Sequence, residues 1–504
     1  MKPMITPAQM RDMEQRYFAE TGTRSIVLME RAARALCDAL LRRFGPNRRV
    51  YFACGPGGNG GDGYACARMY AWAGGRCALF PAAPPASPDA MKNRELALAA
   101  GIPELSPQGA PEAPDVWVDA LYGTGLSRAP EGGAAALIDR MNRDRDRGAA
   151  VVAVDIPSGL NGLSGAAFSP CVRADMTVAF QLEKTGLRLG DGLDVCGEIE
   201  AADIGIPPEF LPDGLAALME QADARHALPP KPRNAHKNMN GHLLIVAGST
   251  GMAGAAAMCA QAALRSGAGL VTVACPESVL GIVQVLAPCA MALPLPEADG
   301  ALSMEAADAL RPALAGKHAV ACGCGLSRRA APEALRLLMT CGIPAVFDAD
   351  ALNLIAADER LKALLSPHHL ITPHPGEAAR LLGRAAADPI ADAFALQGLG
   401  CQALLKGATS VIPVGRQARL SASGCPGMAK GGSGDVLTGL SGALTAQYAA
   451  AGTAMTGEAL AECAAVASEL HGLAGELAQA RVGARGMCAA DIVEALPRAL
   501  SGDA

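Results

Sequence analysis

Short apolar runs alternate with helical patterns along most of this 504-residue chain. In the first half, apolar runs that suit buried strands lie at 49–53, 77–80, 116–118, 150–154 and 176–180. Helical patterns lie at 7–41, 63–73 and 134–143. Strands separated by helices form parallel sheets whose two faces are covered by helices. The alternation therefore predicts an α/β fold in three layers, with a sheet between two layers of helices.

A proline-rich stretch at 228–234 interrupts this pattern, since proline continues neither a helix nor a central strand. Beyond it the alternation returns with a different sequence, and we expect strands at 243–247, 270–274, 319–321, 345–347, 370–372 and 410–413. The chain is also too long for one typical domain. We therefore predict two three-layer αβα domains, 1–215 and 236–504, joined by a linker at 216–235.

Charge and composition narrow the classes of partner. The formal net charge is −6 and no basic run is present, which argues against a nucleic-acid partner. The N-terminus lacks the apolar segment of a signal peptide, and charged residues interrupt the alanine-rich stretches. The 16 cysteines are scattered through apolar segments, as in proteins of a reducing compartment. We expect a cytoplasmic protein with no membrane partner.

Polar, glycine-rich loops follow three predicted strands of the first half, at 55–63, 119–125 and 155–159. Ligands of parallel sheets bind beyond the carboxyl ends of the strands, where these loops converge. The oxygens of Asn59, Asp119 and Ser158 suit a hard monovalent or divalent cation, and the lack of His and Cys disfavours zinc. Plainer interpretations stay open, because Asp62 could cap a helix and Asp155 could shape a turn.

The second half contains the motif G-G-S-G-D at 431–435, which runs directly into an apolar helical pattern. Glycines at a helix start leave N–H groups free to converge on an anion, and the helix dipole adds partial positive charge. Asp435 can then take a proton from a hydroxyl while the amides hold a phosphoryl group. The motif predicts a nucleotide site, and a glycine turn capped by Asp is the alternative.

The loops of the first half resemble those of the YjeF N-terminal family, the NAD(P)H-hydrate epimerases. The shared motifs are G-G-N-G-G-D-G at 57–63, D-A-L-Y-G-T-G at 119–125, D-I-P-S-G at 155–159, Lys184 and the segments 5–10 and 28–32. One departure is Gly58, which stands where the family usually has asparagine. The resemblance implies a Rossmann-like domain.

The second half resembles the ribokinase-like ADP-dependent NAD(P)H-hydrate dehydratases. The shared motifs lie at 236–237, 248–255, 267–271, 348–353, 372–377, 406–407 and 432–435. Asn238 departs from the family, which usually has glycine after His-Lys. This resemblance implies a ribokinase-like domain fused to the epimerase domain.

The epimerase resemblance implies a catalytic role for Asp155 and a K⁺ ion bound by Asn59, Asp119 and Ser158. It assigns substrate contact to two loops and to the same aspartate: Gly58, Asn59, Gly60, Gly61, Asp62, Gly123, Thr124, Gly125, Leu126, Ser127, Arg128, Ala129 and Asp155. The implied reaction interconverts the R and S epimers of NADH hydrate and NADPH hydrate.

The dehydratase resemblance implies that Asp435 is catalytic and that ADP is the cosubstrate, accompanied by Mg²⁺. It assigns nucleotide contact to Lys406, Gly407, Ala408, Thr409, Ser410 and Gly434, and hydrate contact to Ala255, Gly325, His374 and Asp435. The implied products are NAD(P)H, AMP and phosphate, formed from the S hydrate. We also expect a homo-oligomer.

Two alternatives stay open at this point. The second half could be a kinase of a small alcohol, such as a vitamin precursor, because G-x-G-D is shared across ribokinase-like enzymes. The first half could be a non-catalytic binding module, although Asn59, Asp119, Asp155 and Ser158 are all present.

Overall fold

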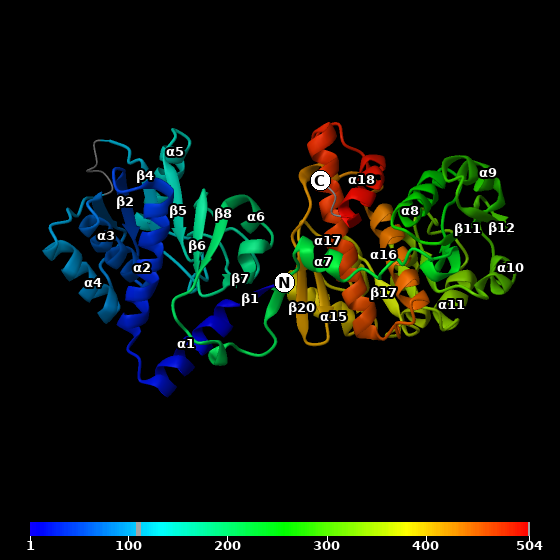
Figure 1. Ribbon diagram of the computed structural model, residues 1–504, viewed down its shortest axis with the longest axis horizontal. Helices are drawn as coiled ribbons and strands as arrows, with labels where there is room; N and C mark the ends of the chain where they lie inside the picture. Colours follow the sequence, from blue (N-terminus) through cyan, green and yellow to red (C-terminus); the bar gives the residue numbers. More distant parts are fainter. Residues whose placement is uncertain (107–111, 502–504) are drawn as a thin grey trace. The chain divides into compact units, whose positions relative to one another are not determined.

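The computed structural model describes residues 1–106 and 112–501, and Figure 1 labels many of its helices and strands. It forms two compact units, Pro3–Ala216 and the chain from Ala217 onward together with Met1 and Lys2. Each unit is built on a parallel sheet, so the predicted fold class is confirmed.

The first unit contains a six-stranded sheet in the order β3-β2-β4-β5-β6-β8, in which all neighbours are parallel. Its strands are β2 (Arg49–Cys54), β3 (Arg76–Pro81), β4 (Val116–Ala120), β5 (Ala150–Val154), β6 (Met176–Phe180) and β8 (Glu198–Ala202). The five predicted strands are present, and β5 and β6 have the predicted bounds. The edge strand β8 was missed because Glu198 and Glu200 leave no apolar run.

Helices pack on both faces of this sheet, because successive strand residues point to opposite sides. Phe52 is buried with Leu36 on one face, and Tyr51 is buried with Leu137 on the other. The helices are α1 (Pro7–Thr21), α2 (Ser25–Phe44), α3 (Gly58–Trp72), α4 (Pro88–Ala99), α5 (Gly132–Arg145) and the short α6 (Gly192–Val195).

Two helix predictions for this unit need correction. The helix expected over 7–41 is two helices, because Gly22 ends α1 with the left-handed φ of 69°. The helix expected at 63–73 begins earlier, at Gly58. The glycine-rich segment therefore forms the first turn of α3 rather than a loop before it.

The second unit contains a seven-stranded parallel sheet in the order β12-β11-β10-β15-β16-β17-β18. Its strands are β10 (His242–Val246), β11 (Leu270–Pro276), β12 (Met291–Leu295), β15 (Ala319–Cys322), β16 (Ala345–Phe347), β17 (His369–Ile371) and β18 (Gln402–Ala403). The two-stranded β13 (Glu297–Ala298) and β14 (Ala301–Leu302) are antiparallel.

The strand predicted at 410–413 forms but does not join this sheet. It is β19 (Ser410–Val414), which pairs antiparallel with β20 (Gln417–Ser421), and β20 pairs in parallel with β9 (Ala216–Leu218). An apolar run predicts that a strand forms, but it does not predict which strand it pairs with. The segment 216–235, expected as a linker, includes β9 and α7 (Gln221–His226).

Helix α16 (Ser433–Ala450) follows the glycines of the G-G-S-G-D motif, and its residues 436–447 are all buried. The other helices of the unit are α8 (Ala253–Arg265), α9 (Glu277–Leu286), α10 (Ala306–Leu310), α11 (Pro332–Thr340), α12 (Ala349–Ala357), α13 (Glu359–Lys362), α14 (Pro375–Leu382), α15 (Pro389–Gln397), α17 (Gly457–Val482) and α18 (Ala489–Ser501). Because α16 is anchored against α8 and the sheet, its first turn has a fixed position.

Candidate active sites

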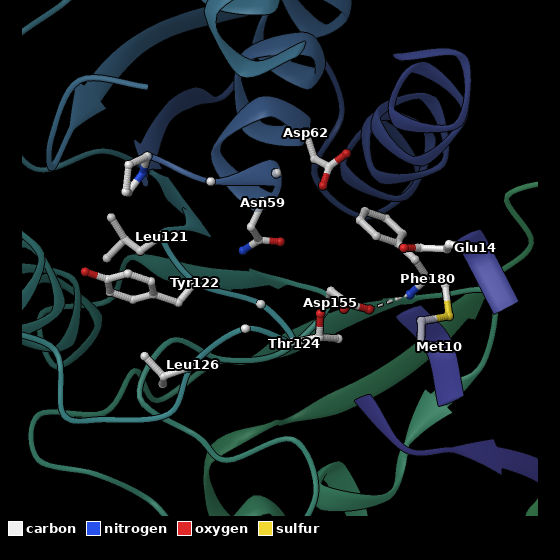
Figure 2. Close-up of a pocket in the computed structure, with 15 residues that line it drawn as sticks. Met10, Glu14, Asn59, Asp62, Leu121, Tyr122, Thr124, Leu126, Asp155 and Phe180 are labelled. Atoms are coloured by element: carbon white, nitrogen blue, oxygen red, sulfur yellow. Dashed lines mark hydrogen bonds between the residues drawn. The ribbon is translucent and has the colours of Figure 1, made fainter. Parts of the chain in front are cut away.

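A cavity of about 460 Å³ lies in the first unit, beside the loops that follow β2, β4 and β5 (Figure 2). Its walls come from α1, from the start of α3, from 121–126, from Asp155 and from Phe180. The predicted residues Gly58, Asn59 and Asp62 line it, as do Gly123, Thr124, Gly125 and Leu126. Segments far apart in the sequence therefore meet at one site, as the strand-end rule predicts.

Asp119 and Ser158 do not line the cavity, but they hydrogen bond to each other next to its wall residue Tyr122, whose amide donates to the Ser158 hydroxyl oxygen over 2.9 Å. The Ser158 hydroxyl donates to Asp119 Oδ1 over 2.6 Å, and the Ser158 amide donates to Oδ2 over 2.7 Å. Burial raises the pKa of Asp119 to about 6, although the hydrogen bonds from Ser158 and Leu121 act to lower it. The third predicted cation ligand, Asn59, has a buried side-chain nitrogen with no hydrogen-bond partner.

Asp155 is held by a buried lysine. Lys184 is fully buried, and its ammonium group donates to Asp155 Oδ1 and, over 2.7 Å, to the Phe180 carbonyl. The Phe180 amide donates to the same carboxylate oxygen over 3.0 Å. Asp155 also has a positive φ of 65°, which is uncommon for a residue with a side chain. The structure therefore fixes this carboxylate at the edge of the cavity.

Glu14 is a cavity residue that sequence reasoning missed. It projects from α1 toward the part of the cavity that contains Asp155 and Phe180 (Figure 2). The pKa of Glu14 is raised to about 7: burial is the main cause and the Asp155 charge adds to it, while Lys184 and Arg11 act to lower it. Burial also raises the pKa of Asp62 well above its usual value. A carboxylate in an amphipathic helix usually faces solvent, so only the folded structure reveals Glu14.

The remaining predicted residues of the first site lie around the main cavity. Ser127, Arg128 and Ala129 line a second hollow of about 260 Å³, which shares Tyr122, Gly125 and Leu126 with the first. Gly60 and Gly61 are buried, and a Cβ at Gly60 would lie 1.9 Å from the Gly55 carbonyl oxygen. Close packing at the start of α3 accounts for glycine at this position.

In the second unit, an ion pair connects two of the motifs. Lys406 Nζ lies 2.6 Å from Asp348 Oδ1, and the Thr438 hydroxyl donates to Asp348 Oδ2 over 2.7 Å. Burial lowers the pKa of Lys406, but the charge and hydrogen bond of Asp348 outweigh it and the net pKa is raised. A Cβ at Gly434 would lie 3.4 Å from Lys406 Nζ. Lys406 and Asp348 therefore lie next to the glycine-rich start of α16.

Asp435 lies in the first turn of α16, directly after the glycines. Gly432 precedes the helix with a φ of 97°, a conformation that residues with side chains rarely adopt. Burial raises the pKa of Asp435 to about 6. A hydrogen bond with Cys324 and the Lys406 charge act to lower this pKa, whereas the Asp348 charge acts to raise it. Asp435 is thus a half-buried carboxyl group beside a buried ion pair.

The other predicted residues of this unit fall into three groups. Ala255 and Gly325 meet, since a Cβ at Gly325 would lie 3.0 Å from that of Ala255. His374 begins α14, where its Nδ1 accepts from the Gly376 amide, and its side chain is 52% exposed. After Lys406, the nucleotide segment has exposed Gly407 and Ala408 and buried Thr409 and Ser410.

Two family models match the two halves. A model described as YjeF-related protein N-terminus matches 25–186, and one described as NAD(P)H-hydrate dehydratase matches 243–498. The bifunctional NAD(P)H-hydrate repair enzyme of Moorella thermoacetica is 39% identical, over 99% of this chain and 96% of its own length. The chain belongs to the family of bifunctional NAD(P)H-hydrate repair enzymes. The predicted family is therefore confirmed.

Other members and one solved structure are also similar. The repair enzyme of Escherichia coli is 35% identical over 94% of this chain and 88% of its own length. A structure of the Bacillus subtilis ADP/ATP-dependent NAD(P)H-hydrate dehydratase co-crystallized with ATP and Mg²⁺ is 25% identical. It covers 56% of this chain and 97% of the Bacillus chain, with a TM-score of 0.45. Family membership does not favour the small-alcohol kinase alternative.

Proposed function

We propose that the first unit interconverts the R and S hydrates of NADH and NADPH, and that the second unit dehydrates the S hydrate with ADP. The observation that carries the proposal is the position of Asp435, at the start of α16 and beside the Lys406–Asp348 pair. This arrangement combines an anion-binding helix start, a base and a cation. In the first unit, the cavity around Asp155 supports epimerisation.

Dehydration begins when Asp435 takes the proton of the C6 hydroxyl group. The hydroxyl oxygen attacks the β-phosphorus of ADP, the bond between that phosphorus and the AMP oxygen breaks, and AMP leaves. The ring-nitrogen electrons then expel phosphate from C6, and loss of the C5 proton restores the dihydropyridine. The backbone amides of 431–434 hold the transferring phosphoryl group, and the positive charge of Lys406 balances the negative charge of that group.

Mg²⁺ fits this site only as an ion that arrives with the nucleotide. Within 1–106 and 112–501, no group of three or more His, Cys, Asp or Glu side chains could hold a metal. Mg²⁺ commonly keeps several waters and binds through substrate phosphates with one or two carboxylates, so such a group is not required. When bound, the ion would neutralise phosphate charge.

K⁺ fits the oxygen cluster of the first unit. Asp119 is fully buried, and its hydrogen bonds come from Ser158 and Leu121; no Lys or Arg ion pair with it occurs in the described ranges. A cation held by Asn59, Asp119 and Ser158 would supply the counter-charge. The ligand atom of Asn59 would be its side-chain oxygen, since the unpartnered side-chain nitrogen is a hydrogen-bond donor and does not bind a cation. When bound, the ion would fix the loops that line the cavity.

The cellular setting is part of the proposal. No helix among the described residues is long and apolar enough to cross a membrane. All 16 cysteines are free, which supports a reducing, cytoplasmic compartment. NADH hydrate, NADPH hydrate and ADP are the proposed small-molecule partners, and the homo-oligomer stays a prediction.

The deciding experiment incubates the purified chain with ADP, Mg²⁺, K⁺ and a mixture of R and S hydrates. Absorbance of the restored dihydronicotinamide should rise until both epimers are consumed, and AMP should form in equal amount. Restoration of the S fraction alone would contradict epimerisation. No restoration, or transfer of phosphate from ATP to a stable product, would contradict dehydration.

A further inference from the structure

Three carboxyl groups from three different elements border the same cavity of the first unit (Figure 2). Glu14 comes from α1, Asp62 from the first turns of α3, and Asp155 from the loop after β5. The aromatic residue Phe180 also lines the cavity. A reaction that inverts a hydroxyl-bearing carbon requires a proton donor and a stabiliser of positive charge, so the three groups can have different tasks.

Asp155 is suited to stabilise charge rather than to exchange a proton. Its Oδ1 accepts from the buried Lys184 ammonium group and from the Phe180 amide. Both interactions hold the carboxyl group in position, and Lys184 is fully buried. The ion pair therefore holds a fixed negative charge at the cavity edge.

Glu14 has the opposite character. In the parts of the chain that the structure describes, no side chain forms an ion pair with it and no hydrogen bond reaches its carboxyl group. The charged groups that face it are Arg11 on the same helix, Asp155, Lys184 and, from α3, Asp62. Burial and the Asp155 charge bring its pKa to about 7, so both protonation states are accessible near neutral pH.

Asp62 is less suited to exchange a proton. Burial raises its pKa well above the usual range, and both Asp155 and Glu14 add to the effect. This shift favours the neutral form of the carboxyl group. It can donate a hydrogen bond to the substrate but does not readily cycle between two states.

We propose that Glu14 donates a proton to the C6 hydroxyl group of the bound hydrate and takes one back during epimerisation. The inference rests on the proposed function. The C6–O bond breaks, the hydroxyl group leaves as water, and the ring-nitrogen electrons form an N1–C6 double bond. The cation that results lies beside the Asp155 carboxylate. Water then adds to the other face of C6 and returns its extra proton to Glu14, which balances the cycle.

The test compares Glu14→Gln with the matched control Glu20→Gln, since Glu20 lies on the same helix and is 60% exposed. Glutamine keeps the shape of the side chain but carries no transferable acidic proton. For Glu14→Gln, kcat of R-to-S interconversion should fall about 10² to 10⁴-fold. KM should change by less than about threefold, because binding contacts remain. Glu20→Gln should match the native chain.

The pH profile gives a second readout. In the native chain, kcat/KM for interconversion should fall as pH rises through about 7, because the free enzyme must carry a protonated Glu14. In Glu14→Gln, the residual activity should lose this dependence. A KM that stays near the native value also shows that the variant is folded at the site.

Separate outcomes overturn the two ideas. The Glu14 inference is wrong if Glu14→Gln keeps kcat within about threefold of the native value, or if its residual activity falls with pH as before. The proposed function itself fails if the native chain does not interconvert R and S hydrates. ADP-dependent dehydration of pure S hydrate should be unchanged in Glu14→Gln.

Discussion

Both units contain a buried aspartate–lysine pair, but the two pairs differ in what surrounds the carboxylate. In the first unit, Asp155 lines the cavity and Lys184 is completely buried behind it. In the second, Asp348 is 1% exposed and bound on both oxygens, by Lys406 and Thr438. Asp155 is therefore placed to contact a bound substrate, whereas Asp348 holds Lys406 in position.

Beside each pair lies a carboxyl group that forms no ion pair with any residue that the structure describes. The pKa of Glu14 is raised to about 7 and that of Asp435 to about 6, in both cases chiefly by burial. We propose the same division of tasks in both units, in which the ion-paired aspartate supplies a charge and a neighbouring carboxyl group exchanges the proton. The difference is that Asp435 lies in the first turn of the glycine-preceded helix α16, whereas Glu14 comes from α1 and shares its cavity with the glycine-rich start of α3.

The largest expected effect is that of Asp435→Asn. The variant keeps the shape and hydrogen-bonding capacity of the side chain but loses the base, so ADP-dependent dehydration of S hydrate should fall about 10² to 10⁴-fold. Interconversion of R and S hydrates should continue at the native rate. The control is Asp308→Asn, because Asp308 lies in the first turn of α10 and is 88% exposed. Normal dehydration by Asp435→Asn would contradict the assigned role.

Asp155→Asn should have the reverse effect. Interconversion should fall about 10²-fold or more, since the fixed negative charge is lost, while pure S hydrate is still dehydrated. Because this variant leaves Lys184 buried without its partner, it can also destabilise the unit. The double variant Asp155→Asn/Lys184→Met removes both charges and should be equally inactive but better folded. Interconversion at the native rate in the double variant would contradict the model.

Replacement of K⁺ by a large, weakly coordinating cation should have a smaller effect that is confined to one activity. Interconversion should slow several-fold, because the cluster of Asn59, Asp119 and Ser158 loses its counter-charge. Dehydration of pure S hydrate, measured in the same buffers, serves as the control and should change little. Equal losses in both assays would exclude the oxygen cluster as the ion site.

The smallest effect concerns stability. The folded-state pKa of Glu14, about 7, lies above its unfolded value of 4.5, so its contribution is favourable below pH 4.5 and is lost as pH rises through 7. Glu14→Gln should therefore stabilise the first unit at pH 8 by about 3 kcal/mol and leave it unchanged at pH 4. Calorimetry of the first-unit transition measures this change. An unchanged Tm at pH 8 would contradict the burial of Glu14.

The sequence predicts the sheets well because buried parallel strands are continuous apolar runs. It predicts β5, β6 and β16 with their observed bounds. It misses β8, whose glutamates interrupt the apolar pattern, and it cannot assign β19 to a hairpin rather than to the main sheet. Pairing depends on contacts between distant segments, which a single apolar run does not encode.

The residues of the candidate sites also divide into those that a local motif predicts and those that depend on tertiary packing. Motifs at strand ends and helix starts single out Asp155, which lines a cavity, and Asp435, which lies in the first turn of α16, because local geometry determines both positions. Glu14 and the Asp348–Lys406 pair depend on tertiary packing. Glu14 carries no local signal, since an acidic residue in an amphipathic helix is ordinarily a surface residue.

We assign epimerisation and dehydration to two separate sites, one in each unit, and expect them to act independently. Mixing two variants that each lack one activity tests this assignment most directly. Asp435→Asn alone should leave the hydrates unrepaired, and Asp155→Asn/Lys184→Met alone should leave most of the R fraction. An equimolar mixture, supplied with ADP and both epimers, should restore complete repair, because the hydrate diffuses between proteins. If the mixture leaves the R fraction unrepaired while each variant keeps its other activity, the two sites do not act independently.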